Sequence, residues 1–419
     1  MKRHCLAMAV SVLALAAAPS TALAGGGGLL GGLVQQTQTA TNSNETNQTA
    51  NSTATSEQTN VNAPVSILSW GANDGNVNQS NNANTSSSAQ NNNGTEQGNS
   101  QSQQGSAGGS GGDKGGSKVE QSQTGENSNT TNQTAESSAT NKQTNINAPI
   151  SILSENSNNG NVNQSNKGNT SSSAQNNNST EQSNHQNQKG SASGKGSGGD
   201  KGKHSHKPCP SKDGSGGGSD GPGGPGGNSG DRGAGSQVDQ TQTAGNSNET
   251  NQTATSSASN EQSNVNAPES SHSKGANGGK VSQSNGGDTS SSAQNNNTTE
   301  QGNWQNQEGS AGGKGDHGRH HGSSKGGQEV DQSQTGDNSN TTNQTAESTA
   351  TNQQENVNAP YSKGGKDSKG GDGGCASHSD KDGRGGGVDQ SNEASTHSSA
   401  QNNNGTEQGN WQNQEGSAS

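Results

Sequence analysis

The sequence has very few of the residues from which a globular core is built. It contains no Phe, one Tyr and three Trp, and hydrophobic residues make up 17% of its 419 positions. Ordering the backbone costs ~1–2 kcal/mol per residue, which burial of apolar side chains normally offsets. This composition argues against a conventional globular enzyme, so we predict no catalytic residue and no cofactor.

Cysteine is equally scarce. Of the three cysteines, Cys5 lies in an apolar leader, and Cys209 and Cys375 lie in glycine-rich segments. In an oxidising exterior these two could pair with each other or cross-link chains, and the sequence leaves both open. His204 and His206 lie near Cys209, and another histidine group surrounds His317. Glycine-rich segments do not preorganise ligands, and paired-ligand spacing is missing, so we predict no metal site.

A long apolar span is missing after the leader. Residues 1–24 combine Lys2 and Arg3, an apolar run and Ala22-Leu23-Ala24, which is typical of a secretory signal peptide. We therefore expect a secreted protein, extracellular or at the cell surface, without a transmembrane anchor after cleavage. The formal net charge of −12 gives no support for a nucleic-acid partner.

What the chain does contain is a repeat. The segment from Val34 to Pro64 returns at 119–149, 238–268 and 330–360. Taking every second residue from Val34, 14 of 16 positions are identical in all four copies, whereas the intervening residues agree at 5 of 15. A side-chain period of two is typical of an extended strand, because successive side chains point to opposite faces.

A second half of each unit obeys the same rule. It begins at Val77, Val162, Val281 and Val388, and 13 of 14 alternate positions are identical. The exception exchanges only Ala and Gly, as does one position of the first half. Sites that accept only the two smallest residues indicate close packing. The face formed by the alternate residues that are the same in all four copies is therefore predicted to point inward.

The predicted interior is therefore polar. Strands stacked ~4.7–4.8 Å apart allow identical Asn and Gln side chains to hydrogen-bond along the stack as ladders. We predict an all-β repeat, a β-solenoid or cross-β stack with inward Gln, Asn, Ala and Ser ladders; the alternative is a largely disordered chain. The first unit supplies these expected inward residues: Gln36, Gln38, Asn42, Asn44, Gln48, Ala50, Ala54, Gln58, Gln79, Asn81, Ala89, Asn91, Asn93 and Gln97.

The expected organisation alternates repeat units with disordered Gly-rich linkers. After the signal peptide comes a Gly/Leu-rich segment, and a short tail ends the chain. The boundaries are 25–33 for that segment; 34–103, 119–188, 238–307 and 330–414 for the units; 104–118, 189–237 and 308–329 for the linkers; 362–387 for a linker inside the fourth unit; and 415–419 for the tail.

Two features bear on the turns. The segments 42–44 and 91–93 are candidate turns, because Asn tolerates left-handed backbone geometry. Short apolar pieces, 65–70 and 150–153, lie between the halves of the first two units. They are interpreted as strands that seal the coil by local packing, or alternatively as a membrane or partner patch.

One segment carries a family resemblance. Gln133-Thr-Ala135-Glu-Ser137-Ser-Ala139-Thr-Asn-Lys-Gln143 resembles the repeat of curlins, the subunits of bacterial curli fibres, in which Gln, small residues and a second Gln face inward. The spacing between its two Gln is one residue shorter than in the curlin pattern. The resemblance implies an extracellular amyloid-type fibre assembled by addition of subunits.

Three functions remain open. The first is a structural protein that self-associates into extracellular or cell-surface fibres or matrix, in contact with surface or matrix components. The second is a disordered, hydrated surface spacer. The third is an ice-binding-like β-solenoid, suggested by Thr37, Thr39 and Thr41 on the outer face. Trp304 and Trp411, which share one register on that face, are candidate association residues.

Overall fold

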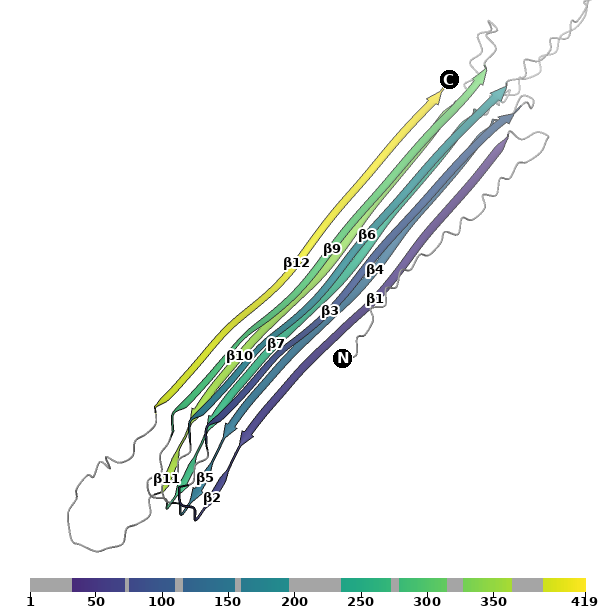
Figure 1. The fold of residues 1–419 in the computed structure, drawn as a ribbon. Coiled ribbons are helices and arrows are strands. Elements are labelled where there is room, and N and C mark those ends of the chain that lie inside the picture. The colour runs from purple at the N-terminus through teal and green to yellow at the C-terminus, as the bar shows by residue number, and fades with distance from the viewer. Residues whose placement is uncertain are drawn as a thin grey trace, which may run out of the picture.

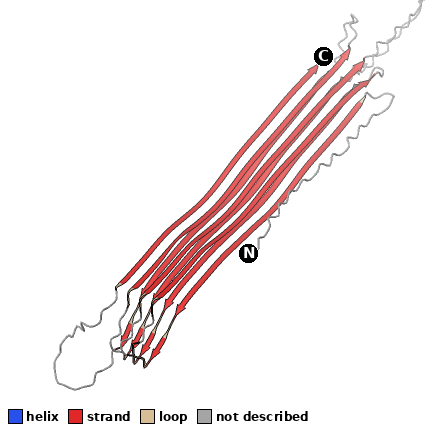
Figure 2. Cartoon of the chain, in the orientation of Figure 1, coloured by secondary structure: helices blue, strands red, loops and turns tan. Residues whose placement is uncertain are grey.

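The structure is a computed structural model, and it describes residues 32–71, 75–109, 116–154, 160–195, 235–272, 279–314, 327–363 and 387–419. Almost all of these residues are in β-strands, and none is helical (Figures 1 and 2). The all-β repeat prediction is therefore confirmed for this part of the chain. The expected signal peptide, Cys209, Cys375 and the histidine groups near them lie outside the described residues.

Each unit forms a long strand, a strand of three residues, and a second long strand that runs back beside the first (Figure 1). The first long strands are β1 (Leu33–Asn62), β4 (Lys118–Asn147), β7 (Gln237–Asn266) and β10 (Glu329–Asn358). The short strands are β2 (Val65–Ile67), β5 (Ile150–Ile152), β8 (Glu269–Ser271) and β11 (Tyr361–Lys363). The returning strands are β3 (Val77–Gly109), β6 (Val162–Lys195), β9 (Val281–Lys314) and β12 (Val388–Ala418).

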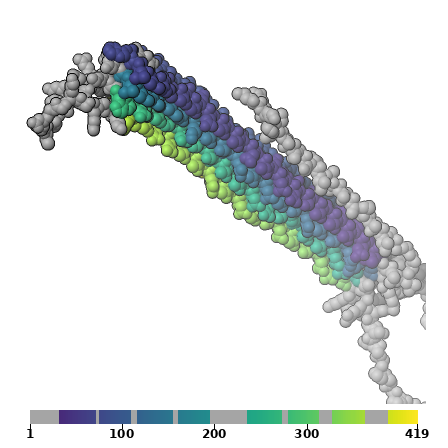
Figure 3. All heavy atoms as spheres, turned by 90° about the horizontal axis from the view of Figure 1, so that it is seen from below, coloured from purple at the N-terminus to yellow at the C-terminus, as the bar shows by residue number. Residues whose placement is uncertain are grey.

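Equivalent strands of the units form three parallel sheets. Their orders are β1-β4-β7-β10, β3-β6-β9-β12 and β2-β5-β8-β11. The register is one-to-one, so that Gln36 lies beside Gln121 and Gln121 beside Gln240. The units are therefore layers of one stack, which the space-filling view shows as successive bands of colour (Figure 3).

The two long sheets face each other and are staggered. Strand β3 contacts both β1 and β4, β6 contacts both β4 and β7, and β9 contacts both β7 and β10. Strands β3, β6 and β9 therefore each lie between two first long strands of the facing sheet. At one end of the stack β1 projects beyond β3, and at the other end β12 contacts only β9 and β10.

Burial follows the parity of the repeat. Along β4 every second residue from Val119 is buried, while the residues between them are exposed or half-buried. The largest fully buried side chains are glutamines, among them Gln123, Gln133 and Gln143. The interior is therefore a layer of amides, with small apolar clusters of Ala and Val set into it.

The turn prediction is wrong for both asparagine segments. Residues 42–44 and 91–93 lie within the continuous strands β1 and β3. The chain instead reverses after the short strands, where Leu68, Leu153 and His272 adopt positive φ of 54–55° and Gly71 and Gly75 follow with positive φ. The asparagines keep extended backbone because their amides bond to the next layer, which requires every strand to stay in register.

The apolar pieces form the short third sheet but do not pack as expected. Val65, Ile67, Leu68 and Trp70 are exposed, Trp70 to 81%. The buried residue of the piece in the second layer is Ser151. The local-packing interpretation is therefore wrong for the first unit, because Val65 and Ile67 have the outward parity and the inward position of β2 is Ser66, in register with the buried Ser151.

The returning strands extend further than the expected unit boundary. They continue to Gly109, Lys195 and Lys314, into segments that we expected to be linkers. Ala107, Ala192 and Ala311 are buried there against Val119 and Val238. The alternation of inward and outward residues thus continues, and the inward residues here are Gly105 and Ala107. Both are small and leave space for the valines of the facing sheet.

Two neighbouring residues of β4 test the inward face. Gln133 is 1% exposed, donates to Gln48 Oε1 at 2.9 Å and to Asn177 O at 3.0 Å, and accepts from Gln252 at 2.8 Å. Gln133→Lys would bury a charge and leave one amide without its acceptor, so we expect a loss of at least about 2 kcal/mol in unfolding free energy. The matched variant Thr134→Lys, on the outer face, should lose less than about 0.5 kcal/mol. Equal losses in denaturant unfolding would contradict the assignment of the two faces.

Candidate self-association surfaces

Among the described residues, the two ends of the stack are open. Strands β1 and β3 at one end, and β10 and β12 at the other, each have a described neighbour on one side only within their long sheets. An edge strand of this kind presents a row of unpaired N–H and C=O groups, which is a template for another strand. We call these surfaces the unit-1 end and the unit-4 end.

Each expected inward glutamine stands in a column that crosses all the layers. In one column Gln121 donates to Gln36 Oε1 at 2.9 Å, Gln240 to Gln121 at 2.8 Å, and Gln332 to Gln240 at 2.9 Å. The columns that begin at Gln38, Gln48, Gln58, Gln79 and Gln97 behave alike. In every one the later layer donates to the earlier layer.

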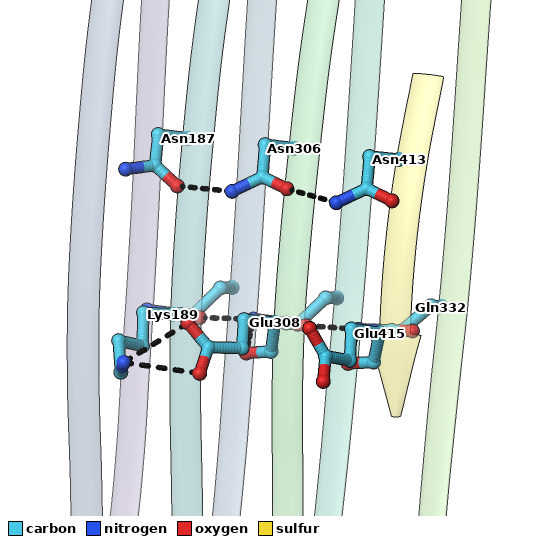
Figure 4. Close-up of polar contacts among 9 residues, drawn as sticks. Asn187, Lys189, Asn306, Glu308, Gln332, Asn413 and Glu415 are labelled. Carbon is cyan, nitrogen blue, oxygen red and sulfur yellow. Dashed lines mark hydrogen bonds and ion pairs between the residues drawn. The ribbon is translucent and has the colours of Figure 1, made fainter. Parts of the chain in front are cut away.

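The inward asparagines form columns of the opposite direction. Asn42 donates to Asn127 Oδ1 at 3.0 Å, Asn127 to Asn246 at 2.9 Å, and Asn246 to Asn338 at 2.9 Å. The columns that begin at Asn44, Asn81, Asn91 and Asn93 also donate from the earlier layer to the later. The outer-face asparagines Asn187, Asn306 and Asn413 run the other way, as the glutamines do (Figure 4).

The same amides also tie the two sheets together. Gln186 Nε2 donates to Gln101 Oε1 in the preceding layer and to the backbone oxygen of Thr243 in the facing sheet, both at 2.9 Å. Because a buried amide without partners costs about 1–3 kcal/mol, these two-way bonds are what makes a polar interior stable.

The expected alanines fill the narrow part of the interior. Ala89 is buried in a cluster with Ala135, Ala174, Ala254 and Ala293, and Ala50 packs against that cluster. Ala54 lies in β1 in register with Ala139, which is 1% exposed.

One column is broken at the first layer. Asn141 donates to Asn260, but Asn141 Oδ1 is buried without a partner in the described structure, since the first layer has Ser56 at this position. Across the interior, a Cβ added to Gly168 would meet the Asn141 amide, whereas Ser56 belongs to the layer that has Ala83. The glycine of the second layer thus makes room for the longer side chain.

This break predicts a stabilising pair of substitutions. Ser56→Asn with Ala83→Gly should let residue 56 donate to Asn141 Oδ1 and should raise the unfolding free energy by about 1 kcal/mol. The fourth layer combines Asn352 with Ala394, and there the amide donates to Gly287 O at 2.9 Å rather than to a later layer. Ser56→Asn alone should gain less, because an amide placed as Asn141 is, donating to the next layer, would meet the Ala83 methyl group. A double-mutant cycle in denaturant measures the coupling between the two sites; a cycle without coupling would refute this explanation of the Ala/Gly exchange.

The two tryptophans meet on the outer face of the returning strands. Trp304 and Trp411 lie in register, edge to face, with ring centroids 4.8 Å apart, and His185 lies 5.2 Å from Trp304. Both indoles are about half exposed, at 50% and 51%. The first layer has Ser100 here, so the aromatic row occupies three of the four layers.

If the aromatic row contributes to association between stacks, its removal should slow assembly without altering the fold. We expect Trp304→Ser with Trp411→Ser to lower the initial rate of sedimentable assembly several-fold at unchanged β content, because exposed apolar rings supply contact area. Trp70→Ser, which removes an indole outside the row, is the matched control. Identical assembly of all three proteins would make the row a neutral part of the surface.

The remaining outer face is charged and irregular. Lys189 pairs with Glu308 at 2.9 Å (Figure 4), and Lys142 pairs with Glu261 at 3.5 Å. Lys118 bonds to Glu120 and Asp239, and these hydrogen bonds raise the pKa of its ammonium group. Of the three threonines expected to form an ice-binding surface, Thr39 is in register with threonine in every layer, but Thr37 is in register with Ser122 and Thr41 with Glu126, so the array as a whole does not repeat.

Other kinds of site receive no support from the described residues. In that part of the chain, no group of three or more His, Cys, Asp or Glu is arranged to hold a metal ion. Nor is any helix there long and apolar enough to cross a membrane. Comparison with protein-family models, curated proteins and solved structures gives no match for this chain.

Proposed function

We propose that this protein is a secreted structural protein whose stacks self-associate into extracellular or cell-surface fibres or matrix. The observation that supports the proposal is the pair of open ends. Both ends present full-length strand edges whose inward residues match those of the layers between them except at Ser56 and at the positions that exchange Ala and Gly. A surface that already stacks on a near copy of itself three times within one chain is suited to stack on a second chain.

The described edges have few of the features that prevent such pairing. Natural sheets block their edges with charged side chains, prolines, bulges or inward charges. Strands β1, β3, β10 and β12 contain no proline, and their charged residues, such as Glu347 and Glu407, all lie on the outer face, while their inward residues are uncharged. The edges are long and regular, which favours association over solubility.

The proposal predicts a fibre with two repeat distances. Purified mature protein, incubated at increasing concentration, should form fibres by electron microscopy. Aligned fibres should diffract at ~4.7–4.8 Å along the axis and near 10 Å across it, from strand and sheet spacing. Circular dichroism should show the same β content before and after assembly. Protein that stays monomeric and folded at high concentration would contradict the proposal.

A further inference from the structure

The opposite directions of the amide columns make the two ends chemically different. Glutamines donate toward the unit-1 end, so their oxygens face the unit-4 end. At that end Gln334 Oε1 and Gln354 Oε1 are buried and have no hydrogen-bond partner in the described structure. In the inner layers the equivalent oxygens accept from the next layer, as Gln242 Oε1 does from Gln334 at 3.0 Å.

The unit-1 end carries the matching donors. Gln38 Nε2 bonds to Ser102 O at 3.2 Å and Gln58 Nε2 to Asn82 O at 3.2 Å, within their own layer. The equivalent amides of later layers, such as Gln123, donate in addition to the preceding layer. Gln38 and Gln58 therefore each retain a donor for a preceding layer, and the described residues contain no such layer.

A second set of unused donors lies on β12. Gln305 donates to Gln186 Oε1 and to Thr335 O of the facing sheet, and Gln301 donates to Gln182 Oε1 and to Ser339 O. Gln412 and Gln408 repeat only the first bond of each pair within the described structure. The missing acceptors would be backbone oxygens one layer further on.

The unit-1 end presents those oxygens. In the returning strands the outward residues direct their carbonyls to the preceding layer, as Asn161 does to Val77 N. In a parallel ladder the carbonyls of successive residues point alternately to the two neighbouring strands. The inward residues of β1 and β4 direct their carbonyls to the following layer. The outward carbonyls of Thr39 and Ser43, which correspond to Thr335 and Ser339, therefore point away from the stack.

We propose that a second copy of this chain docks head to tail, with its unit-1 end on the unit-4 end, so that β1 pairs with β10 and β3 with β12. This inference rests on the proposed self-association and adds its direction and register. Gln334 and Gln354 accept from Gln38 and Gln58 of the next copy, while Gln412 and Gln408 donate to the carbonyls of Thr39 and Ser43.

Shape and sequence support the same joint. At the unit-4 end β12 projects beyond β10, and at the unit-1 end β1 projects beyond β3. When the two ends meet, β12 lies beside the recessed β3 and β1 lies beside the recessed β10. The inward residues of β12 and β3 are identical, and those of β10 and β1 differ only at Gly336/Ala40 and Asn352/Ser56. A two-fold joint between like ends pairs strands antiparallel and places unlike side chains opposite one another, which interrupts every column.

A charge exchange tests the register. Gln38→Glu keeps the acceptor for Gln123 but turns the exposed donor into an acceptor. Gln334→Lys keeps the donor to Gln242 but replaces the acceptor that has no partner with a donor. Each single variant should elongate wild-type seeds about tenfold more slowly at the end that it alters. In the single variants two acceptors, or two donors, then face each other across the joint. The double variant should elongate its own seeds at a rate near that of wild type.

Rescue by the double variant is informative because positions 38 and 334 lie in the first and fourth layers, separated by two layers of their own stack. The matched control combines Gln38→Glu with Gln354→Lys, which are out of register in the proposed joint and should not rescue. Circular dichroism and sedimentation of each unassembled variant verify its fold.

The outcomes separate the two proposals. Wild-type protein that forms no fibres overturns the self-association itself. Wild-type fibres with equal elongation by single, double and control variants, or rescue by the out-of-register control, overturn the head-to-tail joint and leave self-association standing.

Discussion

The hydrogen bond between identical amides of successive layers is the interaction on which this structure depends. A buried Gln such as Gln133 has its oxygen and its nitrogen satisfied only when Gln48 and Gln252 stand directly before and after it. A shift of one residue between layers would turn every side chain to the opposite face and would remove all of these bonds together. The in-register parallel arrangement is therefore specified by the amides rather than by apolar packing.

This dependence explains which substitutions the repeat tolerates. On the inward face the exchanges among layers are confined to Ala/Gly and Ser/Asn, and the Ser56 exchange leaves the Asn141 oxygen without a partner. On the outer face Thr41 can be replaced by Glu126 because water satisfies both side chains. Cross-layer ion pairs such as Lys189–Glu308 add a register preference there, although an exposed pair is worth only about 0–1 kcal/mol.

A stack held together in this way has no natural end. Each layer satisfies the one before it and leaves the same requirement for the one after it, so within the described part of the chain the first and fourth layers retain unpaired backbone and amide groups. Ordinary β-proteins cover or charge such edges. Here the edges keep the repeat sequence, which links the physical basis of the fold to the proposed assembly.

The sequence by itself determined the strands, their two faces and the four-layer repeat. A side-chain period of two, and alternate residues that are the same in all four copies, can both be read along the chain without knowledge of its fold. The amides of the predicted inward set, from Gln36 to Gln97, stand in columns, Ala50 and Ala89 belong to the alanine cluster, and Ala54 is in register with the buried Ala139. Only the tertiary structure decided where the chain turns, because the tolerance of Asn42 and Asn91 for left-handed geometry is a local property, whereas their ladder bonds require the neighbouring layers. The same reason applies to the stagger of the sheets, to the meeting of Trp304 with Trp411, and to the opposite directions of the Gln and Asn columns: each depends on the placement of side chains from different layers, which no single repeat contains.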